Sequence, residues 1–132
     1  MSYVLDSWAV LRLLDGSEPA ASRVEHVCIT ERPIMSWINV GEVFYVIQRL
    51  QGERAARTTV RDLRPTISLE LPTEQRVLDA ARLKADHRMA YADAFAASTA
   101  IAHDAVLLTG DPELLVDDAP WRFEDLRSPD PR

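Results

Sequence analysis

Short apolar segments alternate with longer helical segments along this chain, and this alternation limits the folds open to it more than any other feature. We expect strands at residues 3–5, 33–37, 66–71 and 106–108, with residues 121–123 adding an edge strand. We expect helices at residues 7–14, 17–27, 40–50, 53–64, 73–86 and 91–104, and a short one beginning at Pro112. This order predicts an α/β fold with a mainly parallel central sheet of four to five short strands flanked by helices.

The length and composition fit one compact domain. The chain has 132 residues, of which 47% are hydrophobic, so it can bury a core without metals or disulfides. Cys28 is the single cysteine, and no cluster of cysteine and histidine suggests a zinc site. No apolar run approaches the roughly 20 residues of a membrane span, and the first residues lack the pattern of a secretory signal. We therefore expect a single cytoplasmic domain over residues 1–132, with a frayed tail at about residues 128–132.

The charge balance narrows the ways in which the chain can meet nucleic acid. Fifteen basic residues stand against 21 acidic ones, which gives a net charge of -6. This argues against a protein that binds nucleic acid through a broad basic face. An enzyme that reaches a phosphodiester through bound metal ions stays compatible with the charge, because cations invert the sign of an acidic site.

Four acidic residues fall at positions that a parallel sheet brings to one edge. Asp6 follows the first predicted strand and Asp111 follows the fourth, while Glu42 and Asp93 lie near the starts of two predicted helices. The carboxyl ends of parallel strands and the first turns of the following helices share one edge, where ligands bind. A helix of about 11 residues and a strand of about 5 both span about 16 Å, so the chain returns Asp111 to the level of Asp93. We expect all four carboxylates to converge.

A cluster of carboxylates favours a divalent cation. Taken singly, Asp6, Asp93 and Asp111 are ordinary helix-cap or turn residues. Glu42 lies beside an apolar stripe and is harder to explain in that way. Clustered carboxylates repel one another and lose hydration, which raises their pKa values unless a cation neutralises them. Mg²⁺ and Mn²⁺ prefer carboxylate oxygens and water, so the group of four indicates a site for one of these ions.

The segments around these acids resemble the PIN-domain nucleases, and in order and length they are most similar to the VapC-type toxins of toxin–antitoxin pairs. The segments are Val-Leu-Asp-Ser at 4–7, Asn-Val-Gly-Glu-Val at 39–43, Tyr-Ala-Asp-Ala-Phe-Ala-Ala at 91–97 and Leu-Leu-Thr-Gly-Asp at 107–111. The resemblance extends from residue 3 to about residue 123 and implies a PIN-like fold. It also implies an endoribonuclease that depends on Mg²⁺ or Mn²⁺, hydrolyses RNA with a metal-activated water, and is inhibited by a cognate antitoxin.

The resemblance also assigns roles to residues. It implies that the catalytic acids are Asp6, Glu42, Asp93 and Asp111. Among them, Asp6, Asp93 and Asp111 would hold the metal, and Glu42 would complete the coordination or orient the water. Ser7 and Thr109 match small hydroxyl positions that support the site, although capping and strand-end roles explain them equally well. Glu113 lies where some members carry a further acid, but Pro112 before it would aim it elsewhere, so we leave it outside the set.

Two other classes of function stay open from the sequence. A phosphorelay receiver, which is a signalling domain, has an acidic pocket at the same sheet edge. It would need adjacent acids after its first strand and a lysine after its last, whereas Asp6 stands alone and the single lysine, Lys84, falls in a predicted helix. The other alternative is a non-catalytic PIN-like module that binds RNA or a partner, and the intact acidic set argues against it.

The sequence further predicts protein partners. The helix expected at residues 40–50 carries more apolar side chains than one sheet face needs, which favours a homodimer. The acidic groove should also attract an arginine of the antitoxin through a charge-assisted contact.

Overall fold

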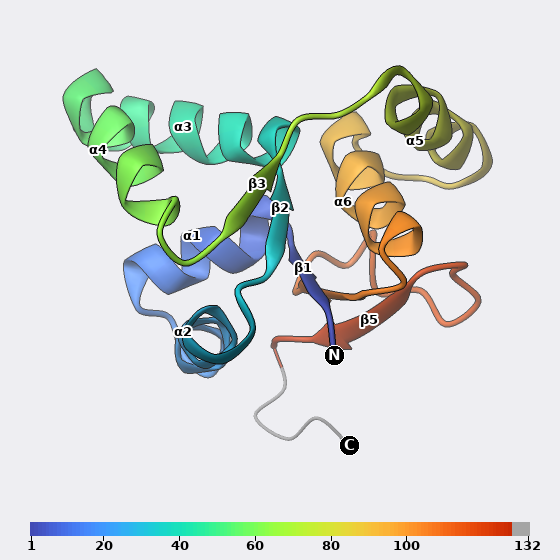
Figure 1. The fold of residues 1–132 in the computed structure, drawn as a ribbon, viewed down its shortest axis with the longest axis horizontal. Coiled ribbons are helices and arrows are strands. Elements are labelled where there is room, and N and C mark those ends of the chain that lie inside the picture. Colours follow the sequence, from blue (N-terminus) through green and yellow to red (C-terminus); the bar gives the residue numbers. More distant parts are fainter. Residues whose placement is uncertain (128–132) are drawn as a thin grey trace.

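The structure is a computed structural model and describes residues 1–127, so the tail expected at 128–132 lies outside the described residues. The described chain forms six helices and five strands, with a pair of helices after each of the first three strands (Figure 1). In chain order the elements are β1 (Tyr3–Leu5), α1 (Ser7–Asp15), α2 (Ala20–Glu31), β2 (Ile34–Ser36), α3 (Trp37–Gln51), α4 (Glu53–Leu63), β3 (Ser68–Glu70), α5 (Glu74–Asp86), α6 (Tyr91–Ala102), β4 (Val106–Thr109) and β5 (Arg122–Asp125).

The five strands form one sheet in the order β3-β2-β1-β4-β5, and every neighbouring pair is parallel. The α/β fold with a parallel sheet is therefore confirmed, and the predicted edge strand exists as β5. From β1 at the centre, the chain first extends the sheet through β2 and β3, and then returns to the other side of β1 to add β4 and β5. The direction of strand addition thus reverses between β1 and β4. Such a reversal opens a crevice at the carboxyl ends of the two strands.

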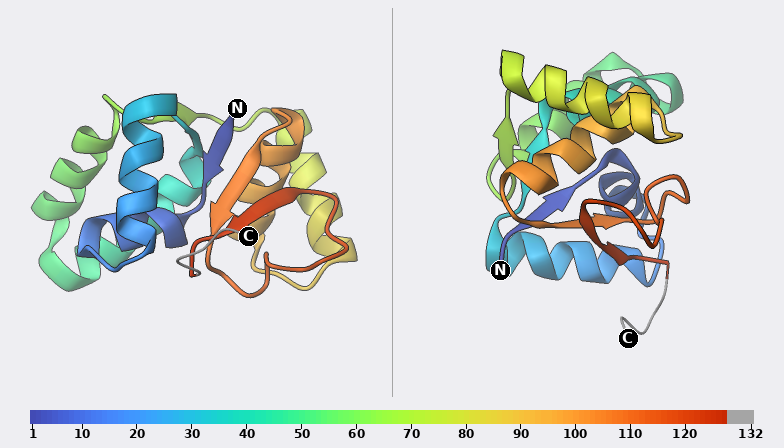
Figure 2. Two further views of the ribbon diagram at one scale, coloured as in Figure 1. Left: turned by 90° about the horizontal axis from the view of Figure 1, so that it is seen from below. Right: turned by 90° about the vertical axis from the view of Figure 1, so that its right-hand side faces the viewer.

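Two hydrophobic cores cover the two faces of the sheet. Successive side chains of a strand point to opposite faces, and in β1 Leu5 packs into a core with α1 to α4 while Val4 packs into a core with α5 and α6. The same division separates Leu108 from Leu107 in β4. Figure 2 shows the strands between α6 on one side and α2 on the other. The central strands β1 and β4 are thus apolar on both faces, and polar groups collect at their ends.

Local signals in the sequence explain where most helices begin and end. Asp6 caps α1 by accepting a hydrogen bond from the backbone N–H of Ala9, and Gly16 ends this helix in the left-handed conformation at a φ of 74°. Ser36 caps α3 in the same way through the N–H of Ile38. The alanine-rich α6 lies close under the sheet, because its small side chains are buried from Ala94 to Ala100.

Two expectations for helices were wrong. The helix expected from Ser17 begins only at Ala20 and continues to Glu31, because Ser17 instead completes the turn after α1, where its N–H bonds to the carbonyl oxygen of Arg12. The short helix expected from Pro112 is not formed. A turn replaces it, in which the N–H of Leu114 donates to the carbonyl oxygen of Asp111.

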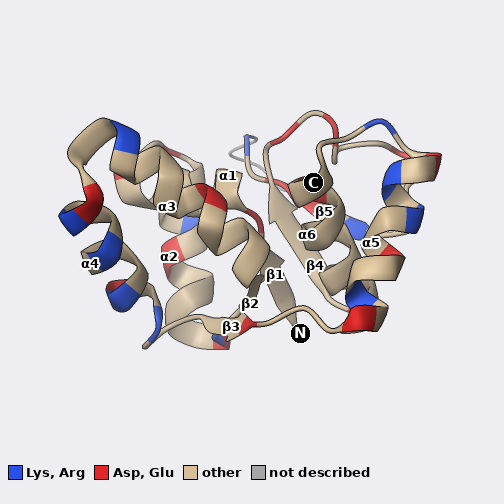
Figure 3. Cartoon of the chain, turned by 90° about the horizontal axis from the view of Figure 1, so that it is seen from above, with Lys and Arg blue, Asp and Glu red and all other residues tan. Residues whose placement is uncertain are grey.

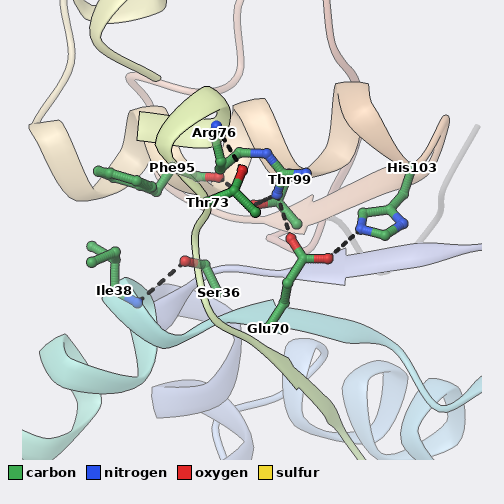
Figure 4. Close-up of polar contacts among 8 residues, drawn as sticks. All are labelled: Ser36, Ile38, Glu70, Thr73, Arg76, Phe95, Thr99 and His103. Atoms are coloured by element: carbon green, nitrogen blue, oxygen red, sulfur yellow. Dashed lines mark hydrogen bonds and ion pairs between the residues drawn. The ribbon is translucent and has the colours of Figure 1, made fainter. Parts of the chain in front are cut away.

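A polar cluster fastens the long crossover from β3 to α6 (Figure 4). Glu70, at the end of β3, pairs with Arg76 of α5 and with His103 just after α6. Arg76 also donates to the hydroxyl of Thr99 in α6, at 3.0 Å. Partial burial works to raise the pKa of Glu70, but the hydrogen bonds and charges of His103 and Arg76 outweigh it and lower the pKa. The cluster therefore ties one strand to two helices on the same face of the sheet.

Within the described residues, no helix combines the length and the apolar character that crossing a membrane requires.

Candidate metal centre

The acidic residues gather at the crevice between β1 and β4. Leu5 lies beside Leu108 in the parallel register, so the next residues along the two strands, Asp6 and Thr109, also meet. The hydroxyl of Thr109 donates to Oδ2 of Asp6 and accepts the backbone N–H of Asp111 at 3.0 Å. One side chain thereby fixes two of the four predicted acids relative to each other.

Asp6 is the most buried of these acids, with 1% of its surface exposed. Its Oδ1 accepts the N–H of Ala9 at 2.8 Å and its Oδ2 accepts the Thr109 hydroxyl. Burial raises the pKa of Asp6 to about 7, although these two hydrogen bonds oppose the shift, and the charges of Asp111 and Glu42 raise it further. Asp6 therefore both caps α1 and contributes a carboxylate to the acidic cluster, which are the two roles considered from the sequence.

Asp93 enters the cluster from the first turn of α6. Burial raises the pKa of Asp93 to about 8, and a neighbouring Asp111 adds to the shift through its charge and a hydrogen bond between the two side chains. The charges of Asp6 and Glu42 act in the same direction. Asp6 and Asp93 thus lie within electrostatic reach of each other and of both Glu42 and Asp111, so the four predicted acids converge as the spacing suggested.

Glu113 joins Asp93 and Asp111, which the sequence analysis did not expect. One ligand oxygen from each of the three carboxylates lies within 4.8 Å of the other two. The turn that replaces the expected helix is responsible, because the N–H of Glu113 donates to Oδ1 of Asp111 and its own Oε1 accepts the N–H of Ala90. Pro112 therefore does not aim Glu113 elsewhere, and its position two residues after Asp111 was the available signal.

Glu42 is held from two sides. Its Oε1 accepts the hydroxyl of Ser7 at 2.7 Å and the side-chain amide of Asn39 at 3.3 Å. The same amide of Asn39 donates to the carbonyl oxygen of Ala92, the residue before Asp93, at 3.0 Å. Ser7 thus contacts an acid of the cluster, as the resemblance implied, and Asn39 is a member that the sequence analysis missed.

The donor set suits a hard divalent cation. In residues 1–127, none of the ion pairs involves Asp6, Glu42, Asp93, Asp111 or Glu113, so no basic side chain of this part neutralises the cluster. Carboxylate oxygens are the ligands that Mg²⁺ and Mn²⁺ prefer. Uncompensated carboxylates with raised pKa values are what such an ion would stabilise in their charged form.

The sequence matches the family described as the PIN domain over residues 3–117. The chain belongs to the PIN-domain family. The signalling-receiver alternative is therefore wrong, and the PIN-like fold expected from the four motifs is confirmed. Comparison with the curated proteins gives no match.

Solved structures share the fold of this PIN domain at low sequence identity. VapBC-1 from nontypeable Haemophilus influenzae is 22% identical, with 97% of this chain and 100% of that chain covered and a TM-score of 0.75. VapBC2 from Rickettsia felis, bound to a DNA fragment from its promoter, is 16% identical, with 95% and 98% covered and a TM-score of 0.75. The sarcin–ricin loop cleaving toxin VapC20 of Mycobacterium tuberculosis is 15% identical, with 84% and 91% covered and a TM-score of 0.69. At these identities the likeness supports the fold.

This PIN domain also carries a groove between α3 and α4, of about 480 Å³. Its apolar lining comes mainly from Trp37, Val40, Phe44 and Val60. Three arginines also line it, namely Arg57 and Arg61 of α4 and Arg64 directly after this helix. Figure 3 shows the basic residues along α4. Since Glu42 points to α1 and not to α4, the groove and the acidic centre lie on different sides of α3.

Proposed function

We propose that the protein is a metal-dependent endoribonuclease and the toxin of a VapBC-type toxin–antitoxin pair, acting on RNA in the cytoplasm. The observation that carries the proposal is the group of five carboxylates at the β1/β4 crevice, with no basic partner in residues 1–127. Membership of the PIN-domain family and the fold shared with VapBC toxin–antitoxin complexes support it. The VapC20 neighbour, described as a toxin that cleaves the sarcin–ricin loop, supports RNA as the substrate class.

Asp93 and Asp111 would hold the metal together with Asp6, and Glu113 offers a further oxygen next to two of them. When bound, Mg²⁺ or Mn²⁺ supplies a water of lowered pKa and neutralises charge at the phosphate. The protein fixes this arrangement through Thr109, which joins Asp6 to the backbone of Asp111. Glu42 lies beside the cluster, and with its Oε1 held by Ser7 it can orient a water or accept its proton.

A cleavage assay with defined metals tests the proposal. The purified chain should cut single-stranded and structured RNA in Mg²⁺ or Mn²⁺, lose the activity in EDTA, and regain it when the metal is returned. The Asp93→Asn variant, purified in parallel, controls for contaminating nucleases and should be inactive under all conditions. Full cleavage in chelator, or equal cleavage by the variant, would show that the acidic centre is not responsible.

The antitoxin that we propose has two kinds of contact to make. The acidic centre should take up an arginine of the partner, which would occupy the place of the cation and keep water from the phosphate. The groove between α3 and α4 should take an apolar segment with acidic residues beside it, because arginines and aromatic side chains line it together. A cleavage assay with the product of the neighbouring gene tests this contact. Undiminished cleavage in a saturated complex would contradict inhibition.

We also propose a homodimer, although α3 has less apolar surface to spare than the sequence suggested. Val40, Val43 and Ile47 are buried in the core of the same chain and so cannot contribute to a dimer contact. Leu50 is 73% exposed and Leu14 of α1 is 42% exposed, and both line a hollow between the two helices. Pairing of this patch with its copy would bury it. Sedimentation at tens of micromolar should give a dimer, and a strict monomer for the wild type would contradict the proposal.

A further inference from the structure

Asn39 occupies an unusual place for a buried amide. Asn39 is the third residue of α3, three residues before Glu42, and it is fully buried on a helix whose other buried residues are apolar. Its Nδ2 donates to the carbonyl oxygen of Ala92 at 3.0 Å and to Oε1 of Glu42 at 3.3 Å. Both partners are acceptors, so the nitrogen end of the amide must face them. The amide therefore connects the two helices, α3 and α6, that supply Glu42 and Asp93.

The other end of the amide argues against a role in stability alone. Oδ1 of Asn39 is buried and has no hydrogen-bond partner among the described residues. A buried acceptor without a donor costs free energy, and an apolar side chain of similar volume would avoid that cost. The position thus holds an amide whose nitrogen contacts the acidic centre, although its oxygen is left without a hydrogen-bond donor among the described residues.

The contacts of Glu42 show what the amide controls. Oε1 receives two donors, from Ser7 of α1 and from Asn39, whereas no hydrogen bond within residues 1–127 involves Oε2. A carboxylate fixed at one oxygen presents the other in a defined direction. Meanwhile the bond to Ala92 fixes the first turn of α6, from which Asp93 projects.

Resting on the proposed nuclease function, we propose that Asn39 is a positioning residue: its amide sets the orientation of Glu42 and the placement of Asp93 relative to it, and so tunes the affinity of the centre for its divalent cation.

The test replaces Asn39 with leucine, which keeps the approximate volume and removes both donors and the unpartnered oxygen. Thr99→Val is the matched control, because Thr99 is a buried polar residue of α6 that contacts Arg76 and Phe95 and none of the acids. Binding of Mn²⁺ alone is measured by calorimetry, thermal unfolding by circular dichroism, and RNA cleavage in saturating Mn²⁺. Asn39→Ala is made as well, so that a failure of the leucine variant to fold leaves the question answerable.

We expect Asn39→Leu to bind Mn²⁺ about 3- to 10-fold more weakly and to cleave about 10- to 100-fold more slowly, with a metal-free Tm at or above that of the wild type. Thr99→Val should keep its Mn²⁺ affinity. In a protein that already carries Glu42→Gln, Asn39→Leu should weaken Mn²⁺ binding and slow cleavage much less than it does in the wild type, because the two residues act as a unit.

Unchanged Mn²⁺ affinity in both Asn39 variants would overturn the positioning role. So would a double variant whose loss of Mn²⁺ affinity and cleavage rate equals the product of the losses in Asn39→Leu and Glu42→Gln. If the wild type itself does not cleave RNA, the proposed function fails, whereas the comparison of Mn²⁺ affinities still decides the role of Asn39.

Discussion

At the scale of single residues, burial raises the pKa values of carboxylates in the acidic centre, so these groups lose their protons only at higher pH than usual. Asp93 illustrates the consequence, since it is 5% exposed and its pKa is raised to about 8. Asp93→Asn removes a charge that the metal-free protein holds at a cost. We expect cleavage to fall at least about 100-fold while the metal-free Tm at pH 8 stays the same or rises by about 3–5 °C. Asp79→Asn, at a partly exposed acid of α5 outside the acidic centre, should change neither by much. A large loss of stability in Asp93→Asn would instead mark Asp93 as a structural residue.

Asp6 combines two tasks that different substitutions can separate. Asparagine keeps an oxygen for the N–H of Ala9 and can still meet the Thr109 hydroxyl, whereas alanine loses both contacts. Both variants should therefore be inactive, but Asp6→Ala should be less stable than Asp6→Asn by about 1 kcal/mol, the usual worth of a helix cap. Urea unfolding of the two metal-free proteins measures the difference. Equal stabilities would mean that the cap contributes nothing here.

Gly110 precedes Asp111 in direct contact with an aromatic ring. A Cβ built at this position would collide with the indole of Trp8, whereas a Cβ at Gly41 would meet nothing within 4 Å. Gly110→Ala should displace the turn that carries Asp111, with a loss of about 1–3 kcal/mol in stability and a strong loss of cleavage. Gly41→Ala, in the middle of α3, should instead stabilise by about 0.5–1 kcal/mol. Unfolding and cleavage measured on both variants separate a specific collision from a general intolerance to alanine.

At the scale of elements, the crossover from β3 to α6 depends on the cluster around Glu70. Arg76 is 13% exposed at its side chain and contacts both Glu70 and Thr99. Arg76→Met leaves a half-buried carboxylate with one partner fewer, so we expect a loss of about 1–3 kcal/mol. Arg57→Met removes an ion pair of the exposed α4 surface and should cost at most about 0.5 kcal/mol. Similar losses for the two variants in denaturant unfolding would contradict a fastening role for the cluster.

At the scale of the whole molecule, the raised pKa values make stability depend on pH. Asp6 and Asp93 titrate near pH 7 and 8 in the folded protein but near 3.8 when unfolded, so between about pH 4 and 8 the folded state holds more protons. Stability of the metal-free protein should therefore fall as pH rises through this window. We expect a Tm about 5–10 °C lower at pH 8.5 than at pH 5.5, and a much flatter profile in Mn²⁺. A metal-free Tm that rises with pH over this range would contradict the raised pKa values.

The order of strands and helices could be predicted from the sequence because each apolar segment and each helical stripe is local. The convergence of Asp93 and Asp111 could also be predicted, since it needs only the rise per residue of one helix and one strand. Glu113 could not, because its place depends on a turn that the sequence equally allows as a helix after Pro112. Asn39 was missed for a different reason. Glu42 lies three residues further along the same helix, but the carbonyl oxygen of Ala92 comes within reach of Asn39 only when α3 and α6 pack together.

The central position of β1 determines when, during synthesis of the chain, the acidic centre can be assembled. Asp6 leaves the ribosome among the first residues, yet its hydrogen-bond partner Thr109 follows 103 residues later, and Asp111 later still. The strand that must lie beside β1 to close the crevice is the second to last of the sheet. A growing chain therefore carries its carboxylates far apart on unpaired segments. If the protein is the endoribonuclease proposed above, it is made next to ribosomal RNA and its own message, and this topology delays completion of the acidic centre until translation of the domain is nearly finished.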